Sequence, residues 1–280
     1  MESAFWDRVV AEGHGVPSGL PLADLTAELT AMLGDTDPRR RDRIGFEVLA
    51  RWVSDGVYDD LLQGLGDGMA SGLGVGLGET GTDTVFRRSF SALVLAECVR
   101  RDNEVHVLPP DSVLSWGDRV ASWLVRERDL RGFVPGKGWA HAVAHGADAL
   151  AALARSEAMG RLELTVLLDV IADRLLQQGY HRFVHGEDDR LAAATMEILR
   201  RDLLGLEVLE PWLARLGAAA RPAPGSGVDR DPYAVAGDVQ GFLRALHLQL
   251  ALSPRPPAHR ADLLLAVIEQ LRATNAATLS

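Results

Sequence analysis

Cysteine is almost absent from this 280-residue chain, which limits the chemistry that can be expected. Cys98 has no second cysteine to pair with, so an intrachain disulfide is excluded. A zinc site built from several cysteines is excluded for the same reason. A lone cysteine inside an apolar helical pattern is expected to be a core residue.

Long apolar runs are also missing. No stretch approaches the ~18 consecutive apolar residues that a membrane-spanning helix needs. The first residues, MESAFWDRVVAEG, contain neither the basic segment nor the long apolar segment of a secretory signal. We therefore expect a cytoplasmic protein that has no membrane partner.

Positive charge is in deficit. Lys and Arg together number 29 against 39 for Asp and Glu, which gives a net charge of -10 at pH 7. This balance argues against general binding to a phosphate backbone, so no nucleic-acid partner is expected. The remaining candidates are a small molecule, a metal ion, or a neutral or basic peptide. The sequence does not indicate the oligomeric state.

Sustained alternation of apolar and polar residues, which marks strands, is absent as well, whereas helical spacing of apolar residues recurs throughout. The sequence therefore predicts an all-α protein. The expected helices cover residues 4–11, 20–33, 37–55, 59–77, 82–102, 110–128, 138–157, 162–178, 188–204, 207–220, 233–252 and 258–273.

Short similar segments recur near the predicted helix ends. Residues 49–55, 95–102, 150–157 and 196–202 resemble one another, at spacings of about 45–55 residues, near the ~40–47 of HEAT repeats. This favours one domain over residues 1–280, a HEAT-like solenoid of helical hairpins with a concave side. A compact helical bundle is the alternative. Residues 221–231, RPAPGSGVDRD, predict a loop before the last two helices.

Two stretches depart from an ordinary helical pattern. Residues 59–77 keep helical spacing of Leu and Met although six glycines interrupt them, and each interior glycine costs roughly 1 kcal/mol relative to alanine. Close helix packing, a hinge or a phosphate-binding loop would explain the glycines; the last is disfavoured because no strand precedes them and no Gly-Lys-Ser/Thr follows.

The run Arg39, Arg40, Arg41 and Arg43 is expected to form a solvated face.

The most informative stretch is residues 127–150, ERDLRGFVPGKGWAHAVAHGADAL. At 100° per residue, a helix over 138–157 places His141, His145 and Asp148 on one stripe. The rest of that helix is mainly alanine, glycine and leucine, so it is expected to be buried. Burying three polar groups without partners would cost several kcal/mol, so they should line a pocket or pair inside the protein.

Three functional interpretations compete for this stripe. His141 and His145 stand one turn apart, a zinc-binding spacing, with Asp148 as a possible third ligand, although no glutamate adjoins His141 as in metalloprotease helices. The same three residues would alternatively be catalytic, with Asp148 orienting a histidine that acts as general acid or base. Ser89 and Ser91 are nucleophile candidates only if the fold brings them close.

The third interpretation is a ligand-binding pocket. The Pro-Gly-Lys-Gly loop precedes a helix N-terminus, which attracts anions. The residues expected to contact the ligand are Arg88, Arg131, Lys137, Trp139 and Arg190. A purely structural role is the alternative to all three: Asp148 would accept hydrogen bonds from Arg88 or Arg131, and the histidines would bond backbone carbonyls. Glu127, Asp129 and Arg131 are expected to form a salt-bridged turn.

Three segments carry a resemblance to a known family: residues 84–96 (TVFRRSFSALVLA), 127–132 (ERDLRG) and 138–148 (GWAHAVAHGAD). They resemble an uncharacterised bacterial family, a domain of unknown function, and the resemblance runs from about residue 37 to 202, with G-W-A-H-x-x-A-H-x-A-D as its most specific element. The resemblance implies an all-helical, HEAT-like fold and no established activity.

The sequence thus predicts a protein that binds a small molecule or peptide on the concave face around Trp139, His141, His145 and Asp148. A metal-dependent or His/Asp-assisted enzyme of hydrolase type, with a divalent metal such as zinc as cofactor, is one alternative. An interaction scaffold without pocket chemistry is the other.

Overall fold

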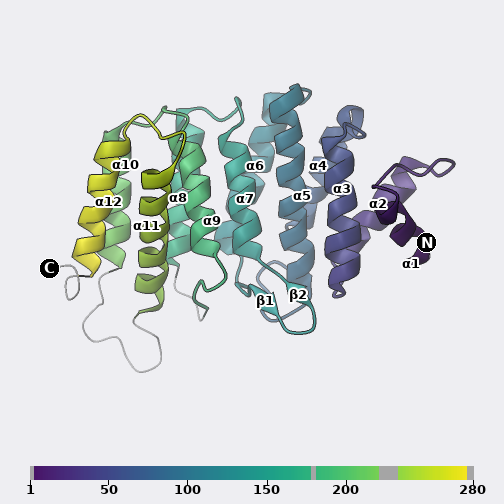
Figure 1. Ribbon diagram of the computed structural model, residues 1–280, viewed down its shortest axis with the longest axis horizontal. Coiled ribbons are helices and arrows are strands. Elements are labelled where there is room, and N and C mark those ends of the chain that lie inside the picture. Colours follow the sequence, from purple (N-terminus) through teal and green to yellow (C-terminus); the bar gives the residue numbers. More distant parts are fainter. Residues whose placement is uncertain (1–2, 178–180, 221–232, 276–280) are drawn as a thin grey trace. The chain divides into compact units, whose positions relative to one another are not determined.

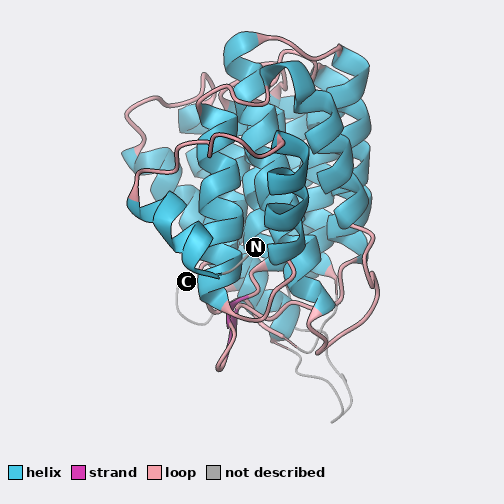
Figure 2. Ribbon diagram, turned by 90° about the vertical axis from the view of Figure 1, so that its right-hand side faces the viewer, coloured by secondary structure: helices cyan, strands magenta, loops and turns pink. Residues whose placement is uncertain are grey.

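A computed structural model of the chain describes residues 3–177, 181–220 and 233–275. The ribbon of the described residues is helical almost throughout, with one short pair of strands between residues 133 and 139 (Figure 2). The prediction of an all-α protein is therefore confirmed. The loop predicted at 221–231 lies outside the described residues.

The helices form two compact units, Met1–Ala158 and Met159–Ser280, each of which is described by itself. The single domain expected from the sequence stays a prediction. Over the described ranges, every helix is too short or too polar to span a bilayer.

The first unit contains most of the predicted site. Its elements are α1 (Ser3–Ala11), α2 (Leu22–Met32), the π-helix η1 (Arg39–Phe46), α3 (Glu47–Ser54), the 3₁₀ turn η2 (Asp59–Leu61), α4 (Leu62–Gly72), α5 (Thr84–Val105), α6 (Pro110–Arg126), β1 (Phe133–Val134), β2 (Gly138–Trp139) and α7 (Ala142–Ala154).

These helices form two layers. In Figure 1, α3, α5 and α7 stand side by side, and α4 and α6 lie behind them. α5 and α7 run parallel, because Ser89 contacts His145 near the start of both helices and Asn103 Nδ2 donates to Ala152 O (3.0 Å) near their ends. In the sequence, α6 connects these two helices and returns the chain to the end at which α7 begins. The contact between α5 and α7 is thus the frame on which the predicted site is built.

Contact with α3, α4 and α7 buries α5 on most of its circumference. Cys98 lies on this helix without any solvent exposure, as its apolar surroundings in the sequence predict. Burial raises the pKa of the Cys98 thiol far above its ordinary value. The thiol is therefore protonated and inert in the folded protein.

The glycine-rich segment serves close helix packing at two positions. α4 passes so near α6 that a Cβ at Gly66 would overlap the ring of Trp116, which is itself fully buried. A Cβ at Gly72 would likewise overlap the hydroxyl of Ser91 on α5. Gly64 and Gly68, on the same helix, face open space. Of the three explanations offered by the sequence, close packing accounts for Gly66 and Gly72.

In its described residues, the second unit has five helices: α8 (Arg161–Leu176), α9 (Glu187–Leu199), α10 (Leu206–Ala219), α11 (Ala234–Leu252) and α12 (Arg260–Thr274). α11 packs between α9 and α12, and α10 packs on α8 and α12. Asp238 on α11 accepts a hydrogen bond from Phe183 N (2.9 Å), which fixes the segment that leads into α9. Burial raises the pKa of Asp238 to about 6, against the opposing effects of that hydrogen bond and of Arg182.

Replacing Gly66 by alanine should destabilise the protein by about 2 to 4 kcal/mol, because the added methyl group must displace the Trp116 ring. Gly64→Ala is the matched control on the same helix: its methyl group meets open space, and the better helix propensity should stabilise by up to about 1 kcal/mol. Chemical denaturation of both variants measures the difference. Equal stability of the two would contradict the close approach of α4 to α6.

Asp238→Asn should stabilise the protein at pH 8 and not at pH values below about 4. The raised pKa means that folding penalises the charged carboxylate, so wild-type stability falls as pH rises from the ordinary pKa to about 6. Asparagine keeps the acceptor for Phe183 N without the charge, and the gain should reach about 2 to 3 kcal/mol.

Urea denaturation of this variant across the pH range provides the measurement. The exposed Asp262→Asn on α12 serves as a control and should change the free energy of unfolding by less than about 0.5 kcal/mol. A gain for Asp238→Asn that is the same at pH 4 and pH 8 would show that the buried charge is not its cause.

Candidate functional site

A β-hairpin, and not a helix, begins the predicted site. β1 and β2 pair antiparallel, with Phe133 opposite Trp139, and the helix α7 starts only at Ala142. The prediction of a helix from residue 138 is therefore wrong at its N-terminal end. The turn requires positive φ at Gly136 (76°) and Gly138 (78°), which glycine adopts without steric penalty.

His141 lies outside the helix, in a left-handed backbone conformation with φ 51°. Non-glycine residues occupy this region at a cost of order 1 to 3 kcal/mol. The ring of His141 stacks on that of Trp139, with centroids 4.3 Å apart and planes 15° apart. The expectation that His141 projects from the same helix as His145 is thus wrong, although the two rings still lie 5.9 Å apart.

A row of rings runs from the exposed hairpin into the core. Phe133 and Trp139, 48% and 41% exposed, meet edge to face at 5.0 Å. Trp139 stacks on His141, which neighbours His145, and His145 meets the edge of Phe90 at 5.1 Å. The two strands of the hairpin therefore expose two aromatic rings, and the His141 ring supports the ring of Trp139.

His145 is 7% exposed and is held by Ser89 of α5, whose Oγ lies 2.8 Å from its Nδ1. The Ser89 hydroxyl also contacts Ala140 O at hydrogen-bonding distance. A hydroxyl has one hydrogen, so Ser89 donates to the carbonyl and accepts from Nδ1–H of His145. A nucleophilic serine would need to give its proton to the imidazole. This arrangement therefore holds the hairpin on α5 rather than activating Ser89.

Asp148 lies farther along α7, beside Glu97 of α5. Glu97 is mostly shielded from solvent, and its pKa is raised first by burial, against the attraction of Arg100, with repulsion by Asp148 adding to the rise. Arg100 pairs with Glu97 from the next turn of α5. The sequence did not single out Glu97, because its partner across the helix contact is visible only in three dimensions.

Arg88 and Glu127 form a bidentate pair in which neither side chain is exposed to solvent. Arg88 Nε and Nη2 donate to the two Glu127 oxygens at 2.6 and 2.9 Å, and Nη1 donates to Val75 O, Gly76 O and Thr84 Oγ1. Glu127 also accepts from Trp123 Nε1 (3.0 Å). The donors of Arg88 are thus bonded to Glu127 and to neighbouring oxygens inside the protein, and not to Asp148 as the structural alternative suggested.

Two of the other predicted cations have acidic partners as well. Arg131 Nη2 binds Asp129 Oδ2 at 2.6 Å, which forms the salt-bridged turn expected from the sequence. Lys137 binds Asp83 at 2.6 Å on the surface. Arg190 is exposed on α9 of the other unit, and its role as a ligand contact stays a prediction.

Arg41 was expected on a solvated face of its helix, and this expectation is wrong. Arg41 is fully buried instead of solvated, with its guanidinium 4.2 Å from the Phe86 ring centre and 4.9 Å from that of Phe90. Its Nη2 donates to Lys137 O (2.9 Å) at the tip of the hairpin. Arg41 precedes Ile44 by three positions and Val48 by seven, so helical spacing already put it on their inward face.

The three predicted metal ligands do not form a recognisable metal site. Among the residues that the structure describes, no group of three or more His, Cys, Asp or Glu side chains has the arrangement of a metal centre. The left-handed backbone of His141 changes the helical spacing on which the zinc interpretation rested. The zinc interpretation therefore has no support in this geometry.

Glu127→Gln should destabilise the protein by about 3 to 5 kcal/mol, because it leaves the Arg88 guanidinium buried without its counter-ion. Lys137→Gln is the control, since it breaks an exposed pair whose loss should change stability by less than about 1 kcal/mol. Thermal and urea unfolding compare the two. A Glu127→Gln protein as stable as Lys137→Gln would show that the buried pair does not hold the α6–α7 connection.

Comparison with known proteins places the chain in a family. The family described as "Protein of unknown function (DUF2785)" matches residues 73–248, which is more than half of the chain. The match begins and ends later than the stretch of about 37–202 suggested by the sequence motifs. Searches among curated proteins and among solved structures gave no significant match. The chain belongs to the DUF2785 family of proteins of unknown function.

Proposed function

We propose that the first unit binds a short basic peptide, or another ligand with a guanidinium or amine, on the surface formed by Phe133, Trp139, His141, Asp148 and Glu97. We name this the α5–α7 surface. The observation that carries the proposal is its pairing of exposed aromatic rings at one end with two closely placed carboxylates at the other.

The aromatic end suits a cation. Tryptophan is the best aromatic partner for guanidinium and ammonium groups, which lie over the ring face within about 6 Å of its centre. Phe133 and His141 both contact the Trp139 ring and hold its orientation. A preorganised ring loses little side-chain freedom on binding, which favours affinity.

The acidic end suits a cation for a different reason. Burial is the main cause of the raised pKa of Glu97, and repulsion by Asp148 adds to it. A positive group between the two carboxylates would add to the attraction that Arg100 already supplies to Glu97. The net charge of -10 adds a long-range attraction for basic ligands.

The dimensions fit a peptide segment. At 1.5 Å per residue, His141 and Asp148 are separated by roughly 10 Å along the direction of α7. An extended chain covers that distance in about three residues. A peptide with one basic side chain over Trp139 and another near Asp148 would therefore span the α5–α7 surface.

The architecture is compatible with this role. Consecutive helices α4 and α5, and then α6 and α7, pack against each other in two layers, which supports the HEAT-like arrangement expected from the repeats. Stacked helical hairpins commonly bind extended peptides along one face. Cytoplasmic residence stays a prediction.

Acetyl-Arg-Gly-Arg-amide should bind the protein, and acetyl-Glu-Gly-Glu-amide should not. Asp148→Asn and Trp139→Ala should each weaken binding by roughly tenfold, the loss expected for one charge-assisted or cation–π contact. Isothermal titration calorimetry measures the affinity of the wild type and of both variants. In the wild type and in Asp148→Asn, movement of the Trp139 indole N–H resonance locates the binding. Binding should also weaken as pH falls towards the raised pKa of Glu97, because protonation removes one of the two charges.

The control is Asp118→Asn, which removes the same charge from an exposed position on α6. It should leave binding unchanged apart from the small general effect of net charge. If the arginine peptide does not bind, or if Asp118→Asn and Asp148→Asn weaken it equally, the α5–α7 surface is not a binding site. The scaffold alternative would then be favoured.

A further inference from the structure

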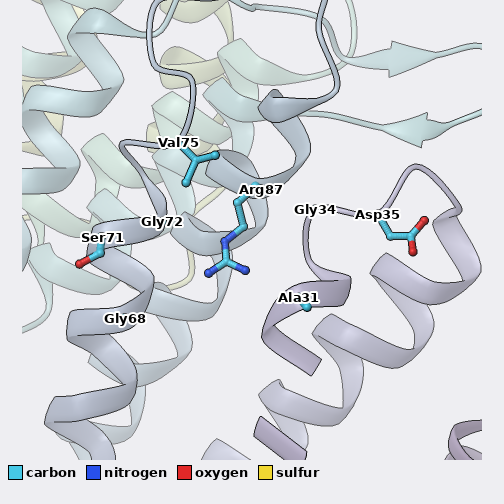
Figure 3. A pocket seen from close by; sticks show the side chains of 8 residues that line it. All are labelled: Ala31, Gly34, Asp35, Gly68, Ser71, Gly72, Val75 and Arg87. Carbon is cyan, nitrogen blue, oxygen red and sulfur yellow. The ribbon is translucent and has the colours of Figure 1, made fainter. Parts of the chain in front are cut away.

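A groove of about 540 Å³ opens beside Arg87 (Figure 3), and none of the residues predicted from the sequence as site residues lines it. Its volume lies within the range of small-molecule sites. Residues 87 and 89 differ by about 200° around α5, so the groove lies on the other side of that helix from Ser89. It shares no lining residue with the α5–α7 surface. The lining residues are Ala31, Gly34, Asp35, Gly68, Ser71, Gly72, Val75 and Arg87.

The Arg87 side chain reaches into this groove from α5, between the ends of α2 and α4 (Figure 3). Its Nη1 donates to Thr30 O in the last turn of α2. Its Nε is buried and has no hydrogen-bond partner within the described residues. Burial lowers the pKa of Arg87, and no carboxylate opposes that effect. The neighbouring Arg88, by contrast, has a complete set of acceptors that includes Glu127.

The one acidic residue in the groove is already engaged. Asp35 Oδ2 pairs with Arg40 Nε at 2.7 Å, and its Oδ1 accepts from Asp37 N at 3.0 Å. Within the described residues, the Arg87 guanidinium therefore has one hydrogen-bond acceptor, Thr30 O at the end of α2, and no carboxylate partner. A half-buried guanidinium in this situation gains free energy when an anion supplies two further acceptors.

A second unsatisfied donor lies next to Arg87. The hydroxyl of Ser91 is fully buried and has no hydrogen-bond partner within the described part of the chain. A Cβ added at Gly72 would overlap this hydroxyl and lie 3.1 Å from Arg87 Nε. Two donors without acceptors thus adjoin the wall of the same groove.

We propose that this groove binds the anionic group of a small molecule, a carboxylate or a phosphate, which the Arg87 guanidinium holds. Glycines 34, 68 and 72 line the groove, and a Cβ at Gly72 would lie 3.1 Å from Arg87 Nε. The absence of a bulky residue at Gly68, where a Cβ meets no atom within 4 Å, leaves room for the rest of the ligand.

A capping role is the competing explanation, because a cation near the carbonyls of a helix C-terminus stabilises that helix. Capping needs only the Arg87–Thr30 bond and predicts no response to anions. The two explanations therefore differ in whether an added anion contacts Arg87, and in whether filling the groove matters.

The experiment is an NMR titration of the full chain with inorganic phosphate and, separately, with succinate, following the Arg87 Nε–Hε resonance. At least one of the two probes should shift this resonance in a saturable way below about 10 mM, and the effective probe identifies the anion class. Gly68→Met, which fills the groove and keeps Arg87, should weaken binding at least about tenfold.

Gly64→Met is the matched control, because Gly64 is one turn earlier on α4, also faces open space and does not line the groove. It should alter binding by less than about twofold. Arg87→Gln, which lacks the observed resonance, is followed through the backbone amide resonance of Gly72 in the groove wall, and the shift of that resonance by the anion should be lost. If that variant fails to fold, the comparison of Gly68→Met with Gly64→Met still decides the question.

Failure of both probes to shift the Arg87 resonance, or equal binding by Gly68→Met and Gly64→Met, would overturn the proposal and leave the capping role. Binding of the arginine peptide should be the same in Gly68→Met as in wild type, since none of the residues that line the groove belongs to the α5–α7 surface. The two proposals can therefore fail independently.

Discussion

The buried pair of Arg88 and Glu127 is the interaction on which the first unit most depends. It joins the start of α5 to the end of α6, and the remaining donors of Arg88 hold the backbone at Val75 and Gly76. The chain leaves this anchor directly into the β1–β2 hairpin. Arg41 fixes the tip of the hairpin from the opposite side through Lys137 O. Two buried guanidinium groups thus determine where Trp139 and His141 lie.

The regular elements were predictable from the sequence because apolar spacing depends on local geometry. The helices around α5 and α6 follow the expected pattern closely, and the turn of Asp129 and Arg131 was expected from their spacing. The hairpin was not expected: its strands have two residues each, too short for any alternation to show. Its formation depends on Arg41, which lies about a hundred positions away in the chain.

The candidate site was predictable in its residues but not in its arrangement. Trp139, His141 and His145 do adjoin one another, yet stacking and a left-handed backbone replace the helical stripe. Arg87 and Arg88 are adjacent in the sequence and are the same type of residue. One faces Glu127, which follows the end of α6, and the other faces a groove at the ends of α2 and α4, so only the tertiary structure distinguishes them. A pattern read from sequence alone cannot assign counter-ions across helices.

The helix α5 brings these features together. One of its sides carries Ser89 and Phe90 to the aromatic row, another carries Arg87 to the glycine-lined groove, and Glu97 adds the acidic end of the α5–α7 surface. The family to which the chain belongs matches it from residue 73, so α5 and α7 both fall within the matched region.

The solitary thiol on α5 has a practical consequence. Because Cys98 is shielded on all sides and protonated, a maleimide or disulfide reagent has no target in the native molecule. Labelling at that position would require α5 to separate from its neighbours, so its rate reports the opening of this part of the fold. Because Cys98 does not react in the native protein, a cysteine introduced at an exposed position would be the single site at which a dye attaches.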